Sequence, residues 1–149
     1  MLSIISNSII ARILTCLTDT DTIMFFGFIL TEDEKLSMET LAHERTHRIQ
    51  WLLTAAISGI LTILAAIVLA LTGHFEWWVL TIPLYAWYLI YCLEWFVRLA
   101  LCWDRQKAYE EISWEVQADK ITRIYLSEYF KTGKEPNLWH LYKQLIFKV

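Results

Sequence analysis

Residues 41–50 read Leu-Ala-His-Glu-Arg-Thr-His-Arg-Ile-Gln and contain the pattern HExxH. Histidines spaced four apart project from one face of a helix, so the imidazoles of His43 and His47 can bind a single metal ion. Glu44 follows the first histidine and would lie beside that metal, where it can take a proton from a water molecule. The stretch therefore predicts a zinc-binding helix that also carries a general base.

A later acidic segment supplies the third protein ligand that a catalytic zinc ion needs. Glu115 and Asp119 lie one helical turn apart. One can therefore bind the metal, while the other contacts a metal-binding histidine and orients it without touching the metal. Glu111, one turn before Glu115, is the rival ligand, and the Ala118-Asp119 pair after Glu115 favours Glu115. The alternative interpretation of HExxH is a solvated helix face with two coincidental histidines. It is weakened because the chain holds only four histidines, two of them in the motif.

The composition of the 149 residues favours a membrane protein. Hydrophobic residues make up 56% of the chain and charged residues 19%, and there are eight tryptophans. A typical soluble domain has roughly 45–50% apolar and about 25% charged residues. The net charge of −3 gives no basic surface for nucleic acid, so no nucleic-acid partner is expected. Three cysteines, an odd number, indicate small buried side chains and no disulfide framework.

Two apolar stretches have the length of membrane spans. Twenty uncharged residues run over 52–71, and a second stretch starts at Trp77 with seventeen uncharged residues and ends near Trp103. About twenty residues are needed to cross the hydrocarbon core. No Lys or Arg lies between Arg48 and Arg98. By the positive-inside rule, the short loop between the spans faces outward and both ends face the cytoplasm. A two-span hairpin would also return Glu115 to the side of the membrane that holds the histidines.

The fold class expected from these patterns is mainly α and membrane-embedded, a single domain over residues 1–149. It comprises a two-span transmembrane hairpin, a cytoplasmic HExxH helix, a third-ligand helix and a short β-strand or hairpin before the HExxH helix. Its expected segments are an N-terminal helix and strand over 1–36, the HExxH helix and first span over 37–72, the second span over 77–103, the third-ligand helix over 105–131 and a last helix over 137–148.

Two smaller patterns add to this expectation. Residues 22–30, TIMFFGFIL, are β-branched and aromatic and fit a strand that stands just before the metal-binding helix. An unpaired edge of such a strand can accept an extended peptide through main-chain hydrogen bonds, although a buried strand or hairpin without that role fits equally. Glu94 and Arg98 are spaced for an intrahelical ion pair near the end of the second span. That pair is either a brace to the metal-binding helix or a snorkelling pair at the interface.

HExxH followed on a later helix by E-x-x-A-D resembles the gluzincin metallopeptidases. The closest parallel is with membrane-embedded members such as the heat-shock-induced inner-membrane protease and the CAAX prenyl protease, which also place spans between the two motifs. The chain is also similar to short bacterial proteins of minigluzincin type. Those proteins share HExxH-x-x-Q with residues 43–50, an aromatic E-W…R stretch with residues 85–98, and A-Y-x-x-I-S-[FW]-E-x-x-A with residues 108–118.

The resemblance implies one zinc ion per chain, bound by His43, His47 and Glu115. It gives Glu44 the role of general base and acid, and Asp119 the role of an acid that orients a zinc ligand without binding the zinc. It implies a hydrolase, a metalloprotease acting on peptides or membrane proteins at the cytoplasmic face of a bacterial-type inner membrane. The chain lacks most of the accessory soluble domain that shapes the cleft of the larger proteases, and no residue clearly matches the one that stabilises the oxyanion. Four residues of suitable chemistry are candidates for that role: Tyr109, Arg123, His140 and Tyr142.

Two other functions are compatible with the sequence. A zinc-stapled helix hairpin could serve as a non-catalytic membrane scaffold or as a regulatory partner of another membrane protein. Glu44 argues against this, because a structural zinc site has no use for a carboxylate that does not bind the metal. A transporter or channel subunit is disfavoured because the spans carry no polar stripe apart from Glu94 and Arg98.

Overall fold

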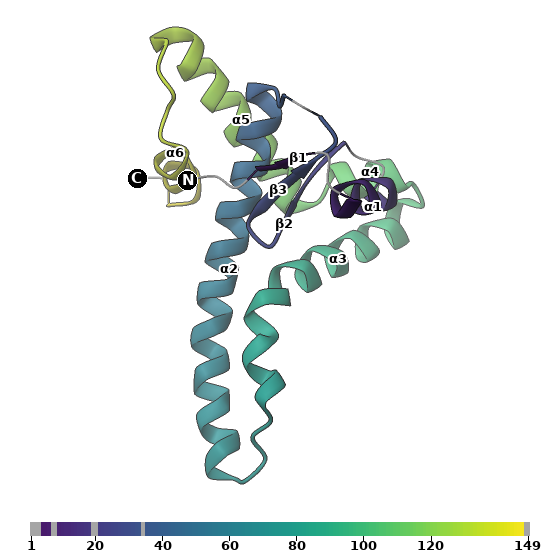
Figure 1. The fold of residues 1–149 in the computed structure, drawn as a ribbon, viewed down its shortest axis with the longest axis vertical. Helices are drawn as coiled ribbons and strands as arrows, with labels where there is room; N and C mark the ends of the chain where they lie inside the picture. The colour runs from purple at the N-terminus through teal and green to yellow at the C-terminus, as the bar shows by residue number, and fades with distance from the viewer. Residues whose placement is uncertain (1–3, 7–8, 19–20, 34, 148–149) are drawn as a thin grey trace. The chain divides into compact units, whose positions relative to one another are not determined.

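The computed structural model describes residues 4–6, 9–18, 21–33 and 35–147. The fold is mainly helical, with one small three-stranded sheet (Figure 1). The chain forms two compact units. One comprises residues 1–49 together with 113–149, and the other comprises residues 50–112. The segments before and after the two apolar stretches therefore belong to the same unit. That unit holds both predicted metal-binding motifs, residues 43–47 and 115–119.

The sheet lies in the first unit and has the strand order β1-β3-β2. Strand β1 (Ile4–Ser6) is parallel to β3 (Phe28–Thr31), and β2 (Thr22–Phe25) is antiparallel to it. The turn between β2 and β3 is made by Phe26 and Gly27, whose φ angles are 47° and 81°. Positive φ at both central residues is the mark of the tight hairpin turn whose twist matches the flanking strands. β3 is thus paired on both sides, and β2 keeps an outer edge.

The N-terminal segment agrees with the sequence-based expectation in one respect and adds a strand to it. Of the expected strand or hairpin before the HExxH helix, the structure has the hairpin, because Gly27 allows the chain to reverse after Phe25. An N-terminal helix and strand were expected within residues 1–36, and a further strand, β1, precedes the helix α1 (Ile9–Thr18). Helix α1 packs on β2 and β3, where Ala11 is fully buried. The short strand β1 is exposed, and it is stabilised by its pairing with β3. Its three residues show no alternation of buried and exposed side chains.

Helix α2 (Met38–Leu71) carries the HExxH motif and continues into the first apolar stretch. Its start is fixed by Ser37, whose hydroxyl accepts a hydrogen bond of 2.9 Å from the backbone N–H of Thr40. Helix α6 (Leu138–Phe147) packs on α5 (Ser113–Thr132), and the first unit buries residues from both: Ala118, Ile121, Tyr125, Leu141 and Tyr142.

The expected third-ligand helix over residues 105–131 is two helices. Helix α4 (Arg105–Glu110) starts at Asp104, whose carboxylate accepts from the backbone N–H of Lys107, and α5 begins only at Ser113. Neither Gly nor Pro marks the break, so the sequence pattern did not predict it. The break places the fully buried Ile112 between the two helices, and α5 starts anew on a serine, a residue that favours helix starts.

The second unit holds the apolar part of α2, a 3₁₀ turn η1 (Trp77–Thr81) and α3 (Ile82–Cys102), within which Pro83 occupies the first turn, where it is tolerated. The two long helices meet at Gly59: a side-chain carbon built there would lie 3.9 Å from the Pro83 ring. Both α2 and the segment Trp77–Cys102 are long and apolar enough to cross a membrane. Only 6% and 17% of their most apolar windows are buried in the protein.

The predicted pair at the end of the second apolar stretch forms. Arg98 donates two hydrogen bonds to the Glu94 carboxylate, at 2.9 and 2.7 Å. A second carboxylate, that of Glu111, lies 3.7 Å from the Arg98 guanidinium. Arg45, on the metal-binding helix, lies 3.7 Å from Glu135. The brace from the Glu94–Arg98 pair to that helix stays a prediction.

Candidate metal centre

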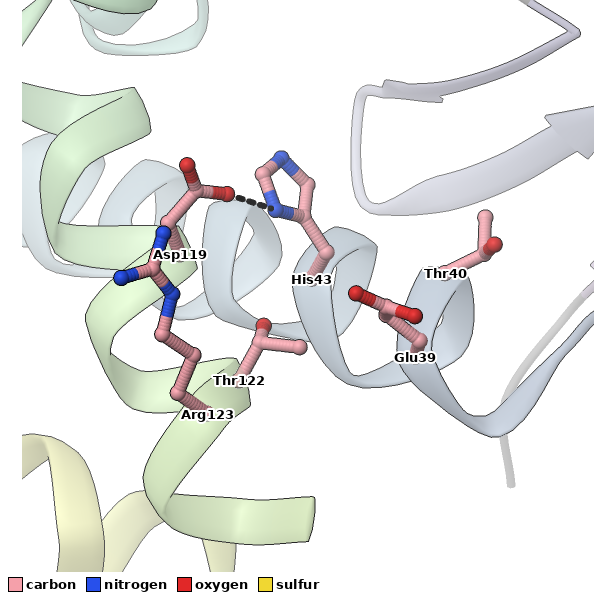
Figure 2. A pocket seen from close by; sticks show the side chains of 6 residues that line it. All are labelled: Glu39, Thr40, His43, Asp119, Thr122 and Arg123. Carbon is pink, nitrogen blue, oxygen red and sulfur yellow. Dashed lines mark ion pairs between the residues drawn. The ribbon is translucent and has the colours of Figure 1, made fainter.

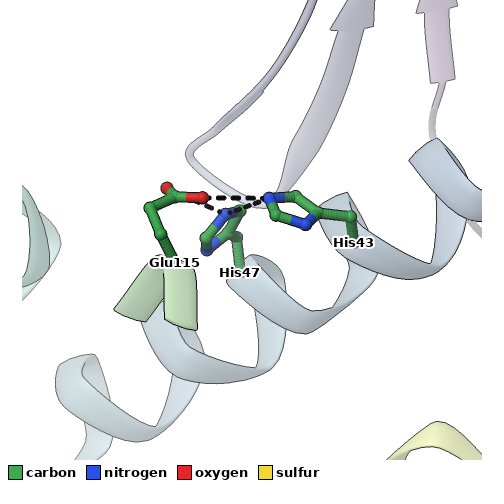
Figure 3. A group of neighbouring side chains, drawn as sticks. All are labelled: His43, His47 and Glu115. Carbon is green, nitrogen blue, oxygen red and sulfur yellow. Dashed lines mark hydrogen bonds and ion pairs between the residues drawn. The ribbon is translucent and has the colours of Figure 1, made fainter. Parts of the chain in front are cut away.

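Three side chains from α2 and α5 converge in the first unit (Figure 3). His43 and His47 are one turn apart on α2, and Glu115 lies in the first turn of α5. One ligand atom from each residue lies within 4.8 Å of the others. The prediction that these three side chains meet is therefore confirmed, and the binding of zinc by them stays a prediction.

The distances between the ligand atoms suit one small ion. His43 Nε2 is 3.0 Å from Glu115 Oε2, His47 Nε2 is 3.2 Å from Glu115 Oε1, and the two Nε2 atoms are 2.9 Å apart. Two ligands of a tetrahedral zinc ion, each bonded at about 2.0–2.1 Å, lie about 3.3 Å from one another. Two imidazole nitrogens and one carboxylate also form a donor set that zinc prefers. The three residues thus fit a zinc ion in both chemistry and spacing.

Asp119 contacts the nitrogen of His43 that does not face the cluster. Its Oδ1 atom is 3.2 Å from His43 Nδ1, and Glu115 Oε2 is 3.0 Å from Nε2, so each ring nitrogen faces a carboxylate oxygen. A neutral ring with its proton on Nδ1 presents a lone pair of Nε2 to the Glu115 carboxylate and to His47 Nε2. Lone pairs that face one another at these distances repel, and a cation between them removes the repulsion. The Asp119 contact agrees with the predicted role of this residue behind a ligand.

Glu44 lies next to the ligands and is not one of the three that converge. It is buried, with 8% of its surface exposed. Burial raises the pKa of its carboxyl group, while the nearby His47 and His43 and a hydrogen bond from the backbone of Met24 act in the opposite direction. The hydrogen bond ties Glu44 to the edge strand β2. A buried carboxyl group with a raised pKa beside two histidines marks a candidate functional site.

The carboxylate of the rival candidate Glu111 has other partners. It is about half exposed and lies within 3.7 Å of Arg98 and 3.9 Å of Lys107. Glu115 is 4% exposed and contacts both histidines. The carboxylate that converges with the two histidines is thus that of Glu115, and its role as a ligand stays a prediction.

Of the four oxyanion candidates, the structure places Arg123 beside His43. Arg123 lines a pocket that is also lined by His43 and Asp119 (Figure 2). His140 contacts Gln144, and Tyr142 stacks on Trp139, in both cases within α6. Tyr109 belongs to the unit of residues 50–112. Three other neighbours of the site were not predicted: Glu39, Thr122 and the backbone of Met24. Glu39 lies one turn before His43, and Thr122 lies three residues after Asp119. Helical spacing could therefore have placed both on the faces that carry these site residues.

Comparison of the chain with protein-family models, with curated proteins and with solved structures gives no significant match. The case for a function therefore depends on the geometry of the site.

Proposed function

We propose that the chain is a zinc-dependent endopeptidase that acts on peptides or membrane proteins. The observation that carries this proposal is the convergence of His43, His47 and Glu115 next to a buried Glu44 that stays outside the ligand set. Three protein ligands leave one position of a tetrahedral ion for water or substrate, which is the arrangement of catalytic rather than structural zinc. The resemblance of HExxH and E-x-x-A-D to the gluzincin pattern points to the same chemistry.

When bound, zinc supplies a Lewis acid for the scissile carbonyl and a water molecule whose pKa is lowered to about 7. Within the chain, a carboxylate oxygen of Glu44 accepts the proton of the attacking water and returns it to the leaving amine. Asp119 holds His43 in the tautomer that directs Nε2 at the cluster. Burial of Glu44 and Glu115 keeps bulk water from competing for these proton transfers.

The edge strand β2 offers a place for an extended substrate. Residues Phe25 and Phe28 flank the tight turn and form a hydrogen-bonded pair, so the main-chain groups of Met24 point away from β3. The hydrogen bond from Met24 to Glu44 agrees with this direction. A peptide that lies along this outer edge would pass close to Glu44. We therefore propose the outer edge of β2 as the place where a peptide substrate binds.

The two long apolar helices support a location in a membrane. Exposed large apolar side chains cover both of them, and so much apolar surface is unfavourable in water. We propose that both cross a bacterial-type inner membrane and that the HExxH helix begins on the cytoplasmic side. The basis for this orientation is the absence of Lys and Arg between Arg48 and Arg98.

The test of the proposed function compares wild type with Glu44→Gln. Glutamine keeps the size and polarity of the side chain and removes the base. Proton-transfer catalysis contributes about 10²–10⁴-fold, so cleavage of unstructured peptides and membrane proteins should fall by at least about 10². Zinc content and thermal stability should change little, because the ligands remain. Glu128→Gln, an exposed change on α5, is the matched control.

Equal cleavage by wild type and Glu44→Gln would refute the role of Glu44 as general base. Full zinc content without cleavage by either protein would favour the non-catalytic scaffold.

A further inference from the structure

A pocket of about 320 Å³ opens beside His43, between the first turns of α2 and the middle of α5 (Figure 2). It lies on the Nδ1 side of the His43 ring, since Asp119, which contacts Nδ1, lines it. Its wall is polar and is formed by Glu39, Thr40, His43, Asp119, Thr122 and Arg123. The volume is sufficient for a polar side chain of a bound peptide.

Thr122 gives the first sign that this pocket receives a ligand. Its side chain is buried, with 4% of the residue exposed, yet its hydroxyl oxygen has no hydrogen-bond partner within the described residues. Figure 2 shows that oxygen directed into the space between the two helices. A buried hydroxyl without a partner is unfavourable, and a bound polar group would satisfy it.

The charges around the pocket give the second sign. Glu39 on α2 and Arg123 on α5 are both exposed and line the pocket, and neither forms an ion pair in the part of the chain that the structure describes. Asp119 contacts His43 Nδ1 through Oδ1, and its side chain is 56% exposed, so it can still accept a hydrogen bond. The groups that a ligand meets are therefore two carboxylates, one guanidinium and one hydroxyl. A carboxylate ligand would be repelled by Glu39 and Asp119, and an ammonium ligand would be repelled by Arg123.

We propose that this pocket binds a planar amide group of a peptide, with the side-chain carboxamide of glutamine or asparagine as its preferred form. The guanidinium of Arg123 donates to the amide oxygen, the carboxylate of Glu39 accepts from the amide N–H, and the Thr122 hydroxyl bonds to either. The inference rests on the proposed function only in taking a peptide as the ligand. Arg123 and Glu39 act here as specificity-determining residues.

The experiment measures binding in the zinc-loaded, full-length Glu44→Gln protein, so that turnover does not enter. The probes are four acetylated, amidated pentapeptides that carry glutamine, glutamate, lysine or norleucine at the centre of an otherwise all-alanine chain. The glutamine peptide should bind about tenfold more tightly than the norleucine peptide. Adding Glu39→Gln should shift the preference to the glutamate peptide, and adding Arg123→Gln should shift it to the lysine peptide.

Opposite shifts separate recognition from unfolding, because a damaged fold would weaken all four peptides alike. Glu128→Gln and Lys120→Gln, exposed changes on α5 that do not line the pocket, are the matched controls and should keep the wild-type preference. Equal binding of all four peptides by the Glu44→Gln protein would overturn the preference for a side-chain carboxamide. No binding of the glutamine peptide at millimolar concentration, or binding unaffected by both pocket variants, would overturn the proposal. Because binding is measured without cleavage, a failure of the peptidase test would leave this result interpretable.

Discussion

The contacts of the candidate site meet at one residue, His43. Its Nε2 atom faces Glu115 and His47, and its Nδ1 atom faces Asp119, so the ring is held at both nitrogens. A ring fixed in this way has one tautomer and one orientation available for metal. His43 also borders the pocket that holds Arg123, so metal binding and the proposed substrate recognition share this side chain.

The first residue-scale prediction concerns metal content. Purified protein should contain about one zinc ion per chain, and His47→Ala and Glu115→Ala should each lose most of it, because two ligands hold zinc poorly. Elemental analysis after dialysis measures this. Glu111→Ala and His140→Ala remove the same residue types outside the cluster and should keep the metal. Unchanged zinc in His47→Ala and Glu115→Ala would refute the ligand assignment.

The second residue-scale prediction concerns Asp119. Replacement by Asn keeps the shape of the side chain but removes the negative charge that faces Nδ1 of His43. Loss of such a partner typically weakens metal binding about 10–100-fold. A competition titration with a zinc chelator should show this loss in Asp119→Asn and none in Glu128→Gln. An affinity equal to that of wild type would show that the contact does not tune the ligand.

At the residue scale, spacing was sufficient to predict the ligands and Asp119, because helical periodicity fixes which side chains share a face. Glu115 and Glu111 have the same chemistry and lie one turn apart; the Ala118-Asp119 pair favoured Glu115, and the structure has the Glu115 carboxylate beside both histidines. The roles of Thr122 and of the Met24 backbone could not be predicted. A missing hydrogen-bond partner and the direction of a main-chain N–H are properties of tertiary structure.

At the scale of elements, α2 and α3 pack through small side chains. Gly59 faces Pro83, and the buried Thr62 and Ala66 follow it on α2. Small residues let helices approach closely where lipid supplies no hydrophobic driving force between them.

The prediction for this interface uses two substitutions of one residue. Gly59→Ala adds a carbon 3.9 Å from the Pro83 ring, an ordinary contact, and should be neutral or stabilising by up to about 1 kcal/mol through helix propensity. Gly59→Leu should destabilise the protein by about 1–3 kcal/mol, because the larger side chain forces the helices apart. Thermal unfolding in detergent measures both. Ala56→Leu, on an exposed position of α2, is the control. A stable Gly59→Leu protein would contradict this packing.

The helices that could be predicted were those with long, strong patterns. α2, α3 and α6 lie close to their expected positions, because runs of apolar residues and caps define them. The strand β1 could not be predicted, since its three residues are held by pairing with β3 from a distant part of the sequence. The break between α4 and α5 was also missed, because no glycine or proline marks it in the sequence.

At the scale of the whole molecule, the distribution of basic residues suggests how the chain is oriented. The loop between the two apolar helices, residues 73–76, has no Lys or Arg, while Arg48 and Arg98 begin the basic segments on the other side. We expect the loop to face outward and both chain ends to face the cytoplasm.

Tags test this orientation directly. A reporter fused after Val149 should be cytoplasmic, and a short tag inserted after Gly73 should react with an impermeant reagent added to intact cells. Gly73 has open space around it, so an insertion there should be tolerated. Zinc content of the tagged protein reports that the fold is intact. A cytoplasmic tag in a protein that still holds zinc would overturn the two-span topology.

The break between α4 and α5 has an electrostatic consequence for the third ligand. Because α5 begins at Ser113, Glu115 lies in the first turn of a helix, where unsatisfied backbone N–H groups give a partial positive charge. Had α4 continued into α5, the same carboxylate would lie in mid-helix without that support. The helix start stabilises the ionised side chain by about 0.3–1 kcal/mol. The backbone thus offsets part of the negative charge of Glu115 and favours its ionised form in a cluster that could hold a metal ion.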